Sequence, residues 1–114
     1  MSKDPINPEK LTNAWLGGRL DAEEIREYLD RNCPTDDFSD DELNHVAECC
    51  HHIYLWHIGA LPDVGHFLAA VLKNNLFEAV NRADDTNVKA LKLYVIFLHN
   101  VAPGTWRAKA KVEL

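Results

Sequence analysis

One long apolar stripe in the middle of the chain constrains the fold most strongly. Between Leu43 and His57, apolar side chains recur three or four positions apart, which is the repeat of one face of an α-helix. Directly before the stripe, Ser39 and Glu42 have the spacing of a capping box, in which each side chain accepts from the other residue's backbone N–H. A long central helix is therefore predicted from Ser39. Its stripe consists of Leu43, Val46, Ala47, Cys50, Ile53, Tyr54 and His57.

The first part of the chain predicts a helical hairpin over residues 1–32. Asn7 and Pro8 favour a helix start, because the Asn side chain accepts from free backbone N–H groups and proline sits where no N–H is needed. Gly17-Gly18 ends that helix. Asp21 opens the second one in the same way, and Pro34 stops it.

Residues 39–100 contain the remaining predicted helices. Gly59 and Pro62 break the chain, after which the apolar spacing predicts a helix over 64–72 and one or two further turns over 76–80. Asp84 caps the last long helix, which carries two neighbouring apolar seams. One seam consists of Val88, Leu91, Val95 and Leu98, and the other of Ala90, Tyr94 and Phe97.

Residues 101–114 carry no helical pattern. Beyond Trp106, apolar and basic residues alternate weakly, a strand-like pattern for which the chain offers no partner strand, so we expect a short C-terminal tail. A chain of 114 residues has the size of one ordinary domain. Residues 1–114 are therefore predicted to form a single all-α domain, a compact bundle of five or six helices with that tail.

Charge is distributed unevenly along the chain. Residues 1–50 hold thirteen acidic and five basic side chains, whereas residues 51–114 hold five acidic and seven basic ones. An acidic front half repels phosphate backbones, so direct nucleic-acid binding is disfavoured and a protein partner with a basic surface is the natural complement. No apolar stretch approaches the length of a membrane-spanning helix, and we expect a cytoplasmic protein.

The densest acidic segment surrounds the predicted start of the central helix. It consists of Asp36, Asp37, Asp40, Asp41 and Glu42, and helix capping explains three of these acids. The remainder form either a solvated loop or a negative patch that binds a basic surface and imitates nucleic-acid phosphates. A calcium loop is excluded, because the glycine of its sharp turn and its distal glutamate are missing.

Histidine and cysteine gather on the predicted central helix. His45, Cys49 and His52 share one helical face and are donors that zinc accepts. A structural zinc site usually draws four ligands from two chain segments, so the competing interpretation is buried cysteines beside surface histidines. Cys49 lacks the helix N-terminal field that activates a thiol. Without a catalytic constellation or a phosphate-binding loop, we expect no enzyme and no cofactor.

Trp106 and Arg107 are candidate interface residues. They follow Pro103-Gly104 in a basic segment, and an isolated exposed tryptophan is unfavourable in water. We expect Trp106 to fold back onto the bundle or to bind a second copy of the chain.

Residues 65–106 carry a resemblance to a known family. The run GHFLAAVLKNNLFEA over 65–79, the run RADDTN over 82–87, and Tyr94, Asn100, Pro103 and Trp106 resemble a family of short, uncharacterised proteins encoded by bacteriophages and prophages. The resemblance implies a helical fold and a phage setting. It carries over no catalytic residues.

Together these observations predict a small acidic module that acts by binding a host or phage protein. An inhibitor of a basic or nucleic-acid-binding protein fits this description. Two alternatives remain: a structural or accessory protein that self-associates, and a protein that binds metal through the histidine and cysteine group.

Overall fold

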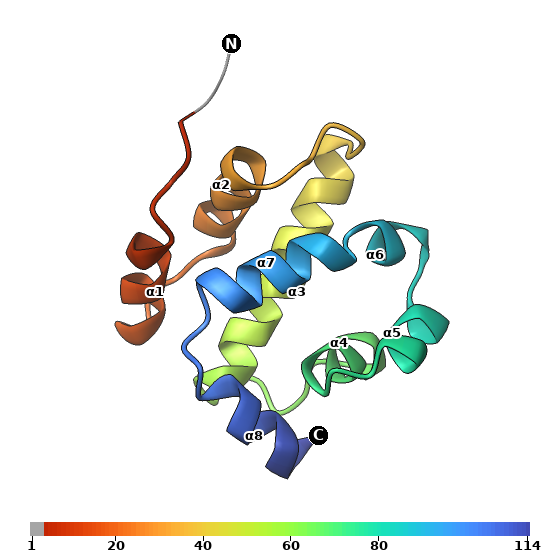
Figure 1. Cartoon of the computed structure of the whole chain (residues 1–114). Coiled ribbons are helices and arrows are strands. Elements are labelled where there is room, and N and C mark those ends of the chain that lie inside the picture. Colours follow the sequence, from red (N-terminus) through yellow and green to blue (C-terminus); the bar gives the residue numbers. More distant parts are fainter. Residues whose placement is uncertain (1–3) are drawn as a thin grey trace.

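The computed structural model describes residues 4–114, and that part of the chain is helical without any strand (Figure 1). The all-α prediction is confirmed, whereas the predicted count of five or six helices is wrong, because the described residues form eight. The helices are α1 (Pro8–Leu16), α2 (Ala22–Asn32), α3 (Asp40–His57), α4 (His66–Leu72), α5 (Leu76–Arg82), α6 (Asp85–Lys89), α7 (Leu91–Asn100) and α8 (Trp106–Glu113).

Four helices begin at the caps that the sequence predicts. Asn7 accepts from the backbone N–H of the α1 first turn at 3.0 Å, and Asp21 caps α2 in the same way at 2.8 Å. Ser39 and Glu42 form the reciprocal capping box of α3, with N···O distances of 3.0 and 3.1 Å. Asp84 caps α6 at 2.8 Å. Local side-chain chemistry therefore sets these boundaries.

The predicted long helix after Asp84 is interrupted. Ala90 leaves helical geometry, with φ −90° and ψ 1°, and separates α6 from α7. The break shifts the helical phase, so that Val88 and Val95 of one predicted seam are 42% and 59% exposed. The first predicted seam is therefore only partly buried, whereas the second seam, of Ala90, Tyr94 and Phe97, is fully buried. The buried face consists of Ala90, Leu93, Tyr94, Phe97 and Leu98.

The predicted C-terminal tail is a helix, α8. Trp106 is only 8% exposed and lies one turn from buried Ala110, so both pack onto the bundle. Lys109 holds α8 in place by donating from Nζ to the carbonyl oxygen of Trp56 at 2.5 Å. Lys109 and Trp56 are more than fifty positions apart, and a local sequence pattern does not show a contact between such residues. The sequence therefore predicted a tail where the structure has a helix.

The core surrounds α3, which contacts both α2 and α7 (Figure 1). Trp15 of α1 packs edge-on against Tyr54 of α3, with ring centroids 5.3 Å apart, and lies 5.8 Å from Phe97 of α7. Its indole Nε1 donates to Nδ1 of His57 at 2.9 Å. Aromatic packing therefore joins the N-terminal hairpin to the centre of the bundle. Within residues 4–114, no helix has the length and apolar character needed to cross a membrane.

Candidate functional site

The acidic segment lies on the loop between α2 and α3 and on the first turn of α3. Asp36, Asp37 and Asp41 are exposed and form no ion pair with any residue of 4–114. Asp40 is 96% exposed, and its Oδ1 lies 3.1 Å from Nη2 of Arg26. Four carboxylates thus face water at one end of the molecule.

Glu42, the fifth predicted member, is bonded within the molecule. Its Oε1 accepts from the backbone N–H of Ser39 and from Nζ of Lys89, both at 3.0 Å. Its Oε2 accepts from the hydroxyl of Thr86 at 3.3 Å. The hydrogen bond from Ser39 and the nearby Lys89 lower the pKa of Glu42 from its ordinary 4.5 to about 2.

The same contacts bring Asp85, which is distant in the sequence, to this end of the molecule. Lys89 of α6 also donates to the carbonyl oxygen of Asp37 at 2.6 Å, and its Nζ lies 4.6 Å from the ring centroid of Phe38. The first turn of α6, which starts with exposed Asp85, therefore lies against the start of α3. No local sequence signal marks this approach. We call Asp36, Asp37, Asp40, Asp41 and Asp85 the acidic face.

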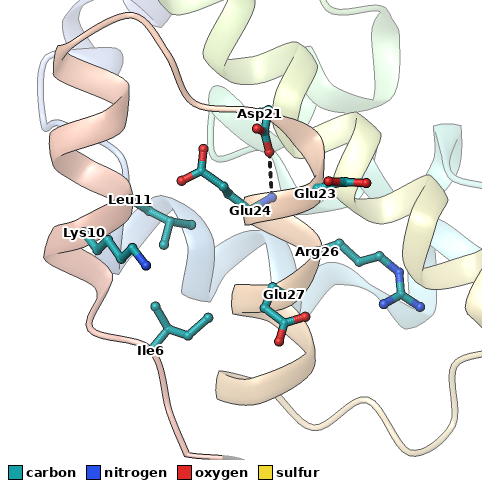
Figure 2. Close-up of a pocket in the computed structure, with 8 residues that line it drawn as sticks. All are labelled: Ile6, Lys10, Leu11, Asp21, Glu23, Glu24, Arg26 and Glu27. Carbon is teal, nitrogen blue, oxygen red and sulfur yellow. Dashed lines mark hydrogen bonds between the residues drawn. The ribbon is translucent and has the colours of Figure 1, made fainter.

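A cleft of about 470 Å³ lies nearby, between the N-terminal segment, α1 and α2 (Figure 2). Its apolar part is formed by Ile6 and Leu11, and Asp21 on its rim caps α2. Figure 2 shows the carboxylates of Glu23 and Glu24 pointing to opposite sides of α2. These two acids therefore do not converge on one point, as a catalytic pair requires. The remaining lining residues are Lys10, Arg26 and Glu27.

The predicted metal ligands are only partly brought together. Nε2 of His45 lies 3.7 Å from Sγ of Cys49, whereas exposed His52 forms no hydrogen bond with either. Across residues 4–114, no group of three or more His, Cys, Asp or Glu side chains is placed to hold a metal ion. Of the three predicted ligands, only His45 and Cys49 lie close together, on successive turns of α3.

The thiols of α3 lie in apolar surroundings. Burial raises the pKa of Cys49 and raises the pKa of fully buried Cys50 further still. A raised pKa keeps a thiol protonated at neutral pH, and the protonated form is a poor nucleophile. These two cysteines therefore lack the environment of a covalent catalyst.

The two predicted interface residues lie at the other end of α3. The ring of Trp106 packs into the bundle, and the guanidinium carbon of exposed Arg107 lies 5.2 Å from the ring centroid. Trp106 therefore folds back, while Arg107 keeps its charge at the surface.

The fold and its surface define a small all-helical protein with a carboxylate-rich end. Comparison with known protein families, with curated proteins and with solved structures finds no match for this chain.

Proposed function

We propose that this chain is a protein-binding module that acts by contact and catalyses no reaction. Its acidic face binds a partner protein that carries a basic surface. The observation that supports this proposal is the exposure of Asp36, Asp37 and Asp41, none of which forms an ion pair within residues 4–114. Capping of α3 needs only Ser39 and Glu42, so these three carboxylates are free to contact a partner.

The physical basis is electrostatic complementarity. Several like charges on one short segment produce a strong local potential, which speeds encounter with a basic surface and selects against acidic ones. Nearby Arg26 and Lys89 are already engaged with Asp40 and Glu42, so they neutralise other members of the cluster. The three unpaired aspartates therefore dominate the contact.

The biological setting is part of the same proposal. The resemblance of residues 65–106 to short phage and prophage proteins supports a phage origin and action in the host-cell cytoplasm. There the module occupies a host or phage protein. We propose that this partner is a nucleic-acid-binding protein and that the module inhibits it. The basic surface of such a protein, which normally binds phosphates, can bind the carboxylates of the acidic face instead.

The test is capture of a basic partner by the immobilised chain from bacterial lysate. We expect one basic protein to be retained at about 0.1 M salt and released at about 1 M, where the screening length falls to roughly 3 Å. In the triple variant Asp36→Asn, Asp37→Asn, Asp41→Asn, retention should fall about tenfold or more, since three interfacial charges are lost.

A matched control removes the same number of charges elsewhere. Glu9, Glu23 and Glu48 are exposed and lie outside the acidic face. Their simultaneous replacement by glutamine should leave capture unchanged. Equal losses in both triple variants, or no loss in either, would rule out the acidic face as the binding surface.

A further inference from the structure

A second concave surface lies between α4, α7 and α8. This groove has a volume of about 910 Å³, and its apolar lining includes Leu98 and Trp106. Lys73, Arg107 and Lys111 also line it, and none of its lining side chains is acidic. The groove therefore combines an apolar floor with three permanent positive charges, although the chain as a whole carries a net charge of −6. We call it the basic groove.

The positive charge of the basic groove is uncompensated within the molecule. Lys73, Arg107 and Lys111 form no ion pair with any residue between 4 and 114. Of the other eight cations in residues 4–114, Lys10, Arg19 and Lys92 likewise form no ion pair, whereas five pair with carboxylates, namely Arg26, Arg31, Arg82, Lys89 and Lys109. No ion pair within residues 4–114 engages these three cations of the groove, so an external anionic group can contact them.

The acidic face and the basic groove lie at opposite ends of α3. The acidic face surrounds Asp40, where α3 begins, whereas α8 is bonded to the carbonyl oxygen of Trp56, near its end. With 18 residues, α3 spans about 27 Å. Figure 1 shows the α2–α3 loop and α8 at the two ends of this helix. One molecule therefore cannot place its own acidic face in its own groove.

We propose that the basic groove binds the acidic face of a second copy of this chain, so that copies associate head to tail. The inference rests on the proposed function of the acidic face and adds a second copy of this chain as another partner of that face. Unpaired Asp36, Asp37 and Asp41 on one copy match the three unpaired cations of the groove on the next. Because the two surfaces differ, a pair of copies still has one unoccupied acidic face and one unoccupied groove. Further copies can bind there, so association extends into chains or closes into rings.

Ionic screening favours this contact over the repulsion between two negatively charged molecules. At physiological ionic strength the screening length is about 8 Å. The molecule measures 44 Å along its longest axis, so most charges of two copies are separated by several screening lengths. Charges in direct contact across the interface are screened much less.

The experiment is sedimentation velocity of the purified full-length chain across a wide concentration range. We expect concentration-dependent species larger than a dimer at about 0.1 M salt, and monomer at about 1 M salt. The groove variant carries Lys73→Gln, Arg107→Gln and Lys111→Gln. The face variant carries Asp36→Asn, Asp37→Asn and Asp41→Asn. Each variant alone should be monomeric, with association weakened about tenfold or more.

Mixing the two variants provides the decisive measurement. The groove variant retains a working acidic face and the face variant retains a working groove, so an equimolar mixture should form a dimer and nothing larger. A control variant with Lys10, Arg19 and Lys92 changed to glutamine should associate like the wild type, because these exposed cations lie outside the groove. Circular dichroism of each variant checks that its helices are retained.

Three results would overturn the inference: a wild-type chain that is monomeric at every concentration, a groove variant that associates like the wild type, or a mixture without dimer. Binding of dodecanoate to a monomeric chain would likewise overturn it and assign the groove to a small amphiphilic anion. If the chain is monomeric while the face variant still loses the lysate partner, only the head-to-tail inference fails. If lysate capture is insensitive to the face variant, the proposed function fails.

Discussion

The carboxylate of Glu42 connects three separate parts of the chain. It accepts from Ser39 at the start of α3, and from Thr86 and Lys89 of α6. The bond to Ser39 could be predicted, because a capping box is local in sequence. The bonds to α6 could not, because they join residues more than forty positions apart and depend on how the helices pack. One acid of the predicted binding segment therefore has a structural role.

This arrangement predicts how stability depends on pH. Because the pKa of Glu42 is lowered from 4.5 to about 2 in the folded protein, the carboxylate contributes stability that is complete above pH 4.5 and is lost as pH falls towards 2. We expect Glu42→Gln to unfold at a lower urea concentration than the wild type at pH 6. The difference between the two midpoints should shrink as pH decreases from 4.5 towards 2.

The control for this measurement is Glu23→Gln, which changes an exposed glutamate that forms no ion pair within residues 4–114. It should shift the urea midpoint little at any pH. A gap between Glu42→Gln and the wild type that stays constant from pH 6 to the acid limit would contradict the assigned contacts.

At the scale of the helices, caps were predictable and packing was not. Asn7, Asp21, Ser39 and Asp84 mark helix starts through bonds to residues two or three positions away. The break at Ala90 has no comparable local signal, since the apolar pattern continues through it. An interruption of one residue rotates the following helix, which is why Val95 faces water although Leu98 of the same predicted seam is buried.

The last helix was missed because its alternating residues resemble a strand. In helical geometry, Arg107 and Lys111 are four positions apart and share the face that lines the basic groove. Lys109 projects elsewhere, towards the end of α3. The basic groove therefore could not be predicted from the sequence, because it requires α8 to be a helix and to pack beside α4 and α7.

Lys109 is expected to hold α8 against the bundle. Its Nζ donates to the carbonyl oxygen of Trp56 and lies 4.9 Å from the centroid of the Trp56 ring. Replacing it in Lys109→Met removes a charged hydrogen bond, which should lower the free energy of unfolding by about 1 to 2 kcal/mol. Amide hydrogen exchange within α8 should become about tenfold faster, the factor that corresponds to roughly 1.4 kcal/mol of opening free energy.

Lys111→Met is the matched control, because Lys111 is exposed and forms no ion pair within residues 4–114. Both variants are measured at about 1 M salt, where we expect the chain to be monomeric. Unchanged exchange from Trp106 to Glu113 in the Lys109 variant would show that packing of Trp106 and Ala110 alone holds the helix.

At the scale of the whole molecule, the acidic segment was predictable and its complement was not. A count along the chain already separates an acidic front half from a slightly basic rear half. Only the fold collects Lys73, Arg107 and Lys111 in one groove and places that groove at the far end of α3. Two opposite charges at the ends of one molecule make its association sensitive to net charge as well as to salt.

This sensitivity gives a prediction for pH. The chain carries a net charge of −6 when its six histidines are neutral, and it reaches neutrality near pH 5.4. The net negative charge therefore shrinks as pH falls from 7.5 towards that value. Burial, assisted by nearby Lys109, lowers the pKa of His57, so this side chain contributes little to the change. Acidification from pH 7.5 to 6 therefore reduces the repulsion between copies.

We expect head-to-tail association to strengthen roughly two- to fivefold over this pH range at constant salt, measured as the dissociation constant from sedimentation velocity. The face variant should remain monomeric at both pH values, which separates specific association from the general loss of solubility near neutrality. Weaker association of the wild type at pH 6 than at pH 7.5 would mean that net repulsion does not limit assembly. Equal association of the wild type and the face variant at pH 6 would assign the larger species to nonspecific aggregation, because the three aspartates would then contribute nothing to the contact.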